Sequence, residues 1–322
     1  MRLSLLDRSR TRAGHPEGAA LAHTVERSVA VEGLGYHRFW VAEHHGVPGV
    51  ASGAPAVLLA AIGAHTATIR LGSGGVMLPH HQPIVVAEQF LMLAGLYPGR
   101  IDLGLGRSLG FTPPVRRALR RSGDEPDTFA DDIVELRSYL ERTAPVTAHP
   151  VVEEPVPLFV LATGRGIEVA ARLGLPVVLG GPALDQPDLG NLLAAYRRDF
   201  RPHRDGRPHV TVSLDVLIAD TDAEARELAL PEVWAMVRSR RTGVFDVLEP
   251  VAAIRDQRWD DRLADRIQHG LDAVPTGSPE TVRRRLEQLA DRTGADELLA
   301  TGATYDRGAL ADSDASLAAL LA

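Results

Sequence analysis

Glu43, His44 and His45 follow the apolar run at residues 38–42, where a predicted strand ends. An imidazole at a strand end can act as a general acid or base, and a neighbouring carboxylate can fix its orientation. We therefore consider one of the two histidines a catalytic candidate, with Glu43 as the orienting group. The alternative is a pair of surface or hydrogen-bonded loop histidines.

The histidine pair does not predict a metal site. Consecutive strand residues point to opposite faces, so His44 and His45 should not aim at one point. The sequence has no H-x-x-x-H pair, no 2-His-1-carboxylate spacing and no cysteine. We therefore predict no metal ligands.

A glycine pair, Gly74-Gly75, comes soon after the predicted strand at residues 69–72, next to Ser73. Adjacent glycines at a strand end let the backbone approach a flat ligand closely or adopt an unusual conformation. A bulge or a tight turn would explain the same glycines without any ligand.

Arg107 follows the predicted strand at residues 101–106, in a G-x-G segment that lacks a third glycine because Leu109 stands in its place. Pro113 and Pro114 also block the immediate helix that the dinucleotide fingerprint requires, so we reject a Rossmann site. Arg107 is better explained as a clamp for an anion, and the alternative is an ordinary surface salt bridge.

The segment Thr163-Gly164-Arg165 follows the predicted strand at residues 158–161. A glycine-rich turn that enters a helix offers free N–H groups and the positive end of the helix dipole, which together bind phosphate. A plain strand-to-helix turn is the alternative. Together, the histidine pair, the two glycine-rich edges and the two arginines suit an anionic, planar cofactor without identifying it.

Short apolar runs alternate with amphipathic or alanine-rich stretches along the chain, and this pattern predicts a parallel sheet with right-handed crossovers. Strands are predicted at residues 2–6, 38–42, 69–72, 101–106, 158–161, 176–179, 209–219 and 297–301. Helices are predicted at residues 18–32, 55–64, 83–97, 128–141, 168–173 and 221–230, with another opening at Ser278-Pro279. About eight repeats favour a (β/α)8 barrel, whose functional groups gather at the carboxyl ends of the strands. We expect one domain over residues 1–322 and assign no structure to residues 232–268.

Composition excludes several classes of chemistry. The 322-residue chain has a formal net charge of -7, which argues against a nucleic-acid partner. Neither cysteine nor lysine occurs, so disulfides, thiolate metal sites, Schiff bases and a P-loop lysine are absent. No stretch predicts a signal peptide or a membrane span, and we expect a soluble, cytoplasmic protein.

The chain resembles the bacterial luciferase-like monooxygenases, and closest among them a subgroup with members in natural-product biosynthesis. The resemblance rests on six segments: GYHRFWVAEHH (35–45), LGSGGVMLPH (71–80), AEQF (87–90), YPGRIDLGLGR (97–107), GSPET (277–281) and ADEL (295–298). It covers nearly the whole chain and is densest over residues 1–110.

The resemblance implies a (β/α)8 barrel, usually dimeric, that uses reduced FMN and O2. The flavin comes from a separate NAD(P)H:flavin reductase and forms a C4a-(hydro)peroxide that oxygenates a small or medium organic molecule. By this resemblance His44 is the catalytic histidine and Gly74-Gly75 hold a non-proline cis peptide under the flavin ring. Arg107 binds the flavin phosphate.

Thr163, Gly164 and Arg165 match the family's second phosphate loop, and we add Ser73 and Leu109 to the cofactor-binding set. The chain departs from its relatives at residues 108–112, where relatives carry A-P-G-T-D. It departs again at residues 162–167, where relatives have Gly-Ser-Ser and a further serine. The second change removes one hydroxyl, which Arg165 is placed to replace.

Two alternatives keep the same barrel. One is a hydride-transfer enzyme that uses the deazaflavin F420, and the other is a non-catalytic flavin-binding partner subunit. For assembly we predict a homodimer through the helices at residues 55–64 and 83–96. The residues proposed for close packing are Ala56, Ala60, Ala61, Ala87 and Leu91, although the barrel could equally use them as its inner helix face.

Overall fold

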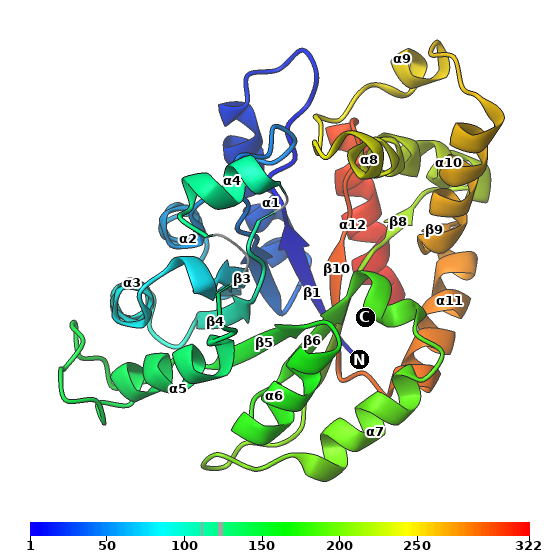
Figure 1. Ribbon diagram of the computed structural model, residues 1–322. Helices are drawn as coiled ribbons and strands as arrows, with labels where there is room; N and C mark the ends of the chain where they lie inside the picture. The colour runs from blue at the N-terminus through cyan, green and yellow to red at the C-terminus, as the bar shows by residue number, and fades with distance from the viewer. Residues whose placement is uncertain (111, 122–124) are drawn as a thin grey trace.

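The computed structural model describes residues 1–110, 112–121 and 125–322, and in these residues eight parallel strands close into a barrel (Figure 1). The strands follow one another around the barrel in the order β1-β10-β7-β6-β5-β4-β3-β2. Their bounds are β1 Arg2–Asp7, β2 Arg38–Val41, β3 Arg70–Met77, β4 Ile101–Gly106, β5 Leu158–Ala162, β6 Val177–Gly180, β7 Val210–Asp215 and β10 Glu297–Thr301. The predicted (β/α)8 fold is confirmed.

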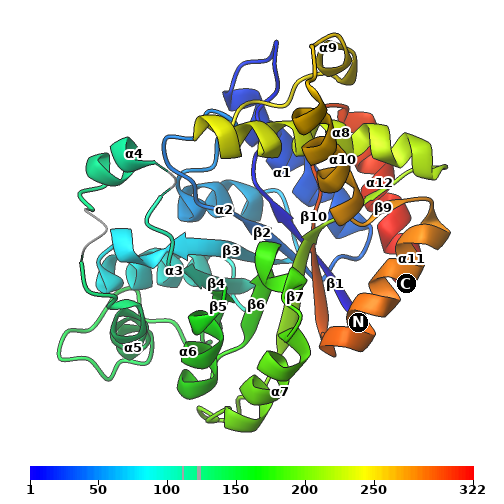
Figure 2. The same ribbon diagram turned by 45° about the vertical axis from the view of Figure 1, so that its right-hand side comes forward.

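Helices surround the barrel and cover its outer face, as Figures 1 and 2 show. Their bounds are α1 Gly18–Gly33, α2 Pro55–Gly63, α3 Pro83–Leu96, α4 Pro113–Ala118, α5 Phe129–Leu140, α6 Arg165–Leu173, α7 Leu189–Asp199, α8 Asp222–Thr242, α9 Val251–Arg255, α10 Asp261–Ala273, α11 Pro279–Thr293 and α12 Arg307–Leu321. Ser278 caps α11, as predicted, by accepting a hydrogen bond from the backbone N–H of Thr281.

Three predicted elements differ from the structure. Strand β3 does not end at residue 72 but continues through the glycine pair to Met77. The run at residues 209–219 divides into β7 and the short β8 (Leu217–Ile218), which pairs with β9 (Thr276–Gly277) in a separate two-stranded sheet. Helix α4 begins directly at Pro113, where we expected the prolines to interrupt the chain, and Phe111 lies outside the described residues.

Helix α8 extends well past the predicted helix at residues 221–230 and continues through Pro231 to Thr242. A capping box starts it: the Thr221 side chain accepts from the N–H of Glu224, and the Glu224 side chain accepts from the N–H of Thr221. With α9 and α10, it accounts for most of the unassigned stretch at residues 232–268. Figures 1 and 2 place α8–α10 at the end of the barrel toward which β1 points.

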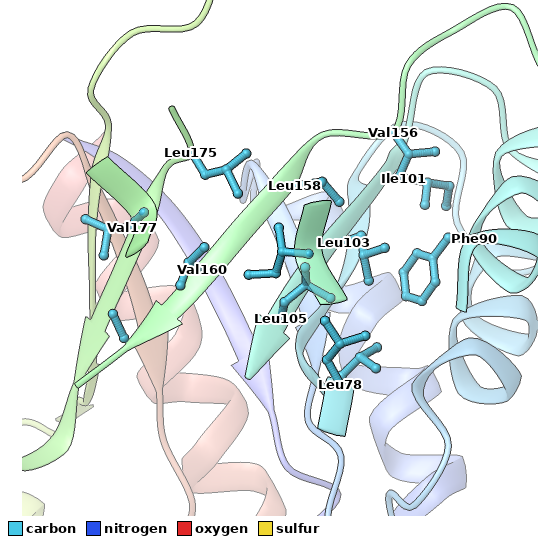
Figure 3. Close-up of a cluster of buried hydrophobic side chains, with 14 of the residues drawn as sticks. Leu78, Phe90, Ile101, Leu103, Leu105, Val156, Leu158, Val160, Leu175 and Val177 are labelled. Atoms are coloured by element: carbon cyan, nitrogen blue, oxygen red, sulfur yellow. The ribbon is translucent and has the colours of Figure 1, made fainter. Parts of the chain in front are cut away.

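The largest hydrophobic cluster lies between the barrel and its helices. Figure 3 shows Phe90 of α3 beside Ile101 and Leu103 of β4, with Leu158 and Val160 of β5 following along the sheet. All five side chains are buried. Burial of such side chains is worth about 1.5–3 kcal/mol each, which anchors α3 against the strands that carry the predicted site.

Ion pairs fill the barrel interior near the amino-terminal ends of its strands. Arg38 of β2 contacts Asp102 of β4 at 2.5 Å and Glu297 of β10 at 2.9 Å. Arg70 of β3 contacts the other Asp102 oxygen at 2.6 Å. Asp102 and Glu297 are almost fully buried, so each carboxylate needs these cations to offset the cost of leaving water. The cluster ties four strands together away from the predicted site.

Strands β3 and β4 approach each other closely through glycine. A Cβ atom added to Gly104 would lie 2.1 Å from the carbonyl oxygen of Ser73. The register between the two strands shifts between Ser73 and Val76, where β3 carries the glycine pair. The side chain of Ser73 spans the shift, since its Oγ donates to the carbonyl of Gly104 and accepts from the N–H of Gly104.

The outer surface of α2 and α3 is apolar, but two of the residues that we predicted to pack in a dimer there are buried. Ala87 and Leu91 are buried against the core, so for these two residues the alternative, packing on the inner face of the helix, is confirmed. The exposed apolar side chains on these two helices include Val57 and Met92, with 72% and 57% of their surface accessible, respectively. Within the described part of the chain, no helix is both long and apolar enough to cross a bilayer.

Substitution of Gly104 tests the close approach of β3 and β4. We expect Gly104→Ala to lower the free energy of unfolding by about 1–3 kcal/mol, because its methyl group must displace the backbone of Ser73. Gly18→Ala is the matched control, since a Cβ there meets no described atom within 4 Å. Urea unfolding measures both, and equal stability of the two variants would contradict the described packing.

Candidate functional site

A cavity of about 550 Å³ opens at the carboxyl ends of β2, β3, β4 and β5. We call it the mouth cavity. It is lined by Glu43, His44, Gly74, Gly75, Met77, Gly106, Arg107, Ser108, Leu161, Thr163 and Arg165. These residues come from four successive strand ends, which is where a barrel of this type gathers its functional groups.

Seven of the ten predicted site residues line this cavity: Glu43, His44, Gly74, Gly75, Arg107, Thr163 and Arg165. Among the residues that the structure describes, Ser73, Leu109 and Gly164 do not line it. Ser73 is fully buried between β3 and β4, and Gly164 adopts a φ of 58° at the start of α6. Ser73 and Gly164 therefore shape the backbone around the cavity.

Four lining residues escaped the sequence analysis: Met77, Gly106, Ser108 and Leu161. Gly106 and Ser108 flank Arg107, and Leu161 lies two residues before Thr163. Met77 faces the cavity because β3 continues through the glycine pair. Extending the predicted strand beyond residue 72 would have placed Met77 at the cavity.

The glycine pair leaves bare backbone on one side of the mouth cavity. The Gly74-Gly75 peptide is cis, as the resemblance implied. A Cβ atom on Gly74 would lie 2.6 Å from Leu6, and one on Gly75 would lie 2.8 Å from the carbonyl oxygen of Gly104. No other residue type fits here without displacing its neighbours, and the resulting surface can accept a flat ring.

Glu43 is almost fully buried in the wall of the cavity and receives three hydrogen bonds. Its Oε1 lies 2.7 Å from Nε2 of both His45 and His81, and its Oε2 accepts from the N–H of Met77 at 2.8 Å. Burial alone would raise the pKa of Glu43, but these hydrogen bonds lower it to about 2. The ionised carboxylate thus holds the strand ends of β2 and β3 together.

Glu43, His45 and His81 also bring two imidazoles and a carboxylate together, with one potential ligand atom from each lying within 4.8 Å of the others. Sequence spacing did not show this set, because His81 comes from the segment after β3 and not from the His44-His45 pair. The hydrogen bonds to Glu43 account for the arrangement, as both imidazoles share one carboxylate oxygen.

His44 lies in the mouth cavity with a strongly shifted titration. Desolvation by burial lowers the pKa of His44 to about 4, and the charges of Arg8 and Arg10 act in the same direction. Glu43 opposes the shift without overcoming it. The imidazole is therefore neutral at pH 7 and can accept a proton or donate one hydrogen bond.

Cationic and hydroxyl groups lie on the other side of the cavity. Arg107 follows β4, and Thr163 and Arg165 stand at the junction of β5 and α6. Arg107 also forms a 2.9 Å ion pair with Asp127, and both partners are partly exposed. The surface salt bridge that we considered as an alternative is thus present, although a contact of this exposed kind contributes at most about 1 kcal/mol.

A network of ion-paired side chains lies between the barrel mouth and α8. Arg8, which follows β1, contacts Asp215 at 2.6 Å and Glu232 of α8 at 3.2 Å. Arg10 contacts the other oxygen of Glu232 at 2.7 Å. The side chains of Arg10 and Glu232 are 3% and 8% exposed, and those of Arg8 and Asp215 are 18% and 25% exposed, so the network extends from a buried ion pair to a partly exposed one. We call these four residues the mouth network.

Comparisons with known proteins point to one protein family. The family model described as luciferase-like monooxygenase matches residues 1–297. A protein of Escherichia coli strain K12 with the same description is 38% identical over 314 residues, covering 95% of this chain and 92% of that protein.

Two further similarities extend this finding. The crystal structure of apo-MsnO8 superposes with a TM-score of 0.88 at 34% identity, covering 99% of this chain and 97% of the other. The N-acetyl-S-alkylcysteine monooxygenase of Bacillus subtilis strain 168 is 40% identical over 187 residues, covering 55% of this chain and 56% of its own.

The titration of His44 is measurable by NMR. We expect the imidazole of His44 to stay neutral between about pH 5 and pH 8 and to titrate near 4, because burial and two arginines disfavour its charge. Since this pKa lies below the usual 6.5, its contribution to stability is complete above pH 6.5 and decreases as the pH falls toward 4.

The His44→Asn variant lacks the His44 imidazole, so the NMR resonance missing from its spectrum is that of His44. The variant should also lose less stability in acid than the wild type. A titration midpoint between about pH 6 and 7, the range of an ordinary histidine, would show that neither burial nor the arginines control His44.

Proposed function

The chain belongs to the luciferase-like monooxygenase family, and from this premise we propose that it uses reduced FMN and O2 to oxygenate a small or medium organic molecule. One observation carries the proposal. The mouth cavity combines a neutral imidazole at His44, bare backbone at Gly74-Gly75, and the guanidinium groups of Arg107 and Arg165. A planar ring with an anionic tail matches all three features.

The residues of the mouth cavity fit the FMN phosphate. A phosphate monoester carries nearly two negative charges, and this sequence has no lysine to neutralise them. Arg107 and Arg165 can each donate paired N–H groups to phosphate oxygens, and Thr163 adds a hydroxyl at the start of α6. The isoalloxazine ring would then lie toward the glycine pair and His44.

The protein's own part in the reaction is to position groups and move protons. Reduced FMN, when bound, supplies the two electrons needed to activate O2. His44 is neutral at working pH, so it can accept a proton from a reacting group and later return it. Glu43 acts through the backbone of Met77 and through His45 and His81, which fix the loop edges around His44.

The partners that we propose follow from the same chemistry. A separate NAD(P)H:flavin reductase would supply the reduced flavin. The relative that is named for N-acetyl-S-alkylcysteines makes a thioether with an amide group a suitable first substrate to test. For assembly we propose a homodimer through α2 and α3, whose outer faces expose Val57, Met92 and Leu96.

Flavin titrations test the role of Arg107. We expect Arg107→Ala to weaken FMN binding by about 10- to 150-fold, the effect of losing charge-assisted hydrogen bonds worth about 1.5–3 kcal/mol. Riboflavin lacks the phosphate and should bind the wild type and the variant alike. Equal losses for both flavins would mean that Arg107 shapes the cavity and does not bind phosphate.

Asp127→Asn is the companion variant, because it removes the competing ion pair of Arg107. FMN should bind about two- to fivefold tighter to this protein, and riboflavin should not. Reduced F420 in the same titration separates the cofactors, since tighter binding of F420 than of reduced FMN would replace the proposed reaction with hydride transfer. Binding of reduced FMN without any substrate-dependent O2 uptake would indicate a non-catalytic subunit.

Light scattering tests the homodimer. We expect the wild type to have twice the 34.6 kDa mass of the chain at micromolar concentration, and Met92→Asp to be monomeric, because a charge would be buried in the interface. Val244→Asp is the matched control, as Val244 is an exposed apolar residue that follows α8 and belongs to neither α2 nor α3. A monomeric wild type would overturn the proposed assembly.

A further inference from the structure

Glu43 differs from the other buried carboxylates of the described residues in the groups that neutralise it. The others are each ion-paired with an arginine: Asp7, Asp102, Glu232, Glu297 and Asp314. The ion-pair partners of Glu43 in this part of the chain are the imidazoles of His45 and His81, which are charged only when protonated. Neutral imidazoles leave a buried carboxylate without a counter-ion, so a cation bound at Glu43 would offset the same cost that arginine offsets elsewhere.

The carboxylate and the two imidazoles form a set of potential metal ligands. Nε2 of His45 and Nε2 of His81 each lie 2.7 Å from Oε1 of Glu43, and one ligand atom from each residue lies within 4.8 Å of the others. Two imidazoles and a carboxylate suit Zn²⁺ and the neighbouring transition metals. From the sequence we rejected the pair His44-His45 as ligands, and the structure replaces His44 in this set with His81.

Two neighbouring strand ends hold these ligands in place. Glu43 and His45 follow β2, whereas His81 comes after β3 and the short turn at residues 78–80. The backbone N–H of His81 donates to the carbonyl of Leu78 at 3.0 Å. The second oxygen of Glu43 accepts from the N–H of Met77, and a contact of this kind orients a carboxylate while leaving its other oxygen to a metal ion.

The two imidazoles give the ligand set its access to solvent. Their side chains are 27% exposed at His45 and 29% exposed at His81, whereas the Glu43 side chain is 1% exposed. Oε1 of Glu43 accepts a hydrogen bond from each ring, so an ion arriving from solvent meets the imidazoles first. When both rings take the tautomer with the proton on Nδ1, the two Nε2 atoms become free to bind the ion.

Metal binding requires only a small movement of the two rings. Ligand atoms in a tetrahedral Zn²⁺ site with bonds of about 2.0–2.1 Å lie about 3.4 Å apart. The two N–O distances of 2.7 Å must therefore lengthen by about 0.7 Å. Both histidines lie beyond the ends of their strands and are partly exposed, so the rings can shift without moving the buried core.

From these observations we propose that Glu43, His45 and His81 form a binding site for a divalent transition-metal ion, with Zn²⁺ as its preferred ligand. The ion replaces two hydrogen bonds with three metal–ligand bonds, and water completes its coordination. It cross-links the end of β2 to the segment after β3 beside the mouth cavity, which Glu43 lines. Hydrogen bonds hold the same residues together without the ion, so the metal is a reversible ligand that stabilises the folded chain.

Zinc titration of the metal-free, full-length protein tests the site. We expect Zn²⁺ to bind in a 1:1 ratio and to raise the midpoint of thermal unfolding as its concentration increases, because the ligand set is assembled only in the folded chain. Mg²⁺ should neither bind nor stabilise, since it prefers oxygen ligands in an octahedral arrangement. Absence of Zn²⁺ binding, or equal effects of the two ions, would overturn the proposal.

Substitution of His81 tests the ligand set. His81→Ala should weaken Zn²⁺ binding by about tenfold or more, because it removes one of the three ligands. His65→Ala is the matched control, as His65 is an exposed histidine after α2 that is outside the set, and its affinity should stay within about twofold of the wild type. If His81→Ala fails to fold, His45→Ala repeats the test from the end of β2. Equal zinc affinity of the ligand variant and His65→Ala would mean that zinc binds elsewhere on the surface.

Cobalt reports on the ligands directly. Co²⁺ in a tetrahedral protein site absorbs visible light more strongly than hydrated Co²⁺, so the wild type should develop visible bands that an excess of Zn²⁺ removes. These bands should be absent from His81→Ala and present in His65→Ala. The same Co²⁺ spectrum in the wild type and His81→Ala would contradict the assignment. None of these titrations requires a flavin, so they decide the metal site whether or not the chain binds FMN.

Discussion

The mouth network is the interaction that holds α8 over the end of the barrel. Glu232 comes from the middle of α8, yet it is held by Arg8 and Arg10, which directly follow the first barrel strand. Removing one member of such a buried pair typically costs about 3–5 kcal/mol, so the network fixes α8 over the barrel end. The same arginines disfavour the charged form of His44. The arginines that position α8 thus also act, together with the larger effect of burial, on the protonation of His44.

The barrel end carries two cavities, the mouth cavity and a second one of about 470 Å³ between α8 and α10. The mouth cavity is built from rigid strand ends with arginines, glycines and an imidazole, which suits a cofactor that is the same in every cycle. The second cavity is bounded by α8, which begins where the strand–helix alternation predicted a helix, and by α10, which lies in the stretch that we left unassigned from the sequence. Both cavities are lined by segments that follow the strands, which is where function resides in a barrel of this type.

Local patterns in the sequence predicted the strands β1 and β4 and most residues of the mouth cavity, because alternation, glycine and strand-end position are local signals. Contacts between distant segments were not predictable in this way. Glu43 pairs with His81 from the next strand end, and Glu232 pairs with arginines more than 200 residues earlier. The extension of β3 was missed because glycine is normally unfavourable inside a strand, whereas here close packing against Gly104 requires it.

A crystal structure of the protein soaked with FMN would test the central claim most directly. We expect electron density for the ring against Gly74-Gly75 and beside His44, with the phosphate within hydrogen-bonding distance of Arg107 or Arg165 and the cavity between α8 and α10 left free. FMN bound between α8 and α10, or a phosphate pointing away from both arginines, would contradict it.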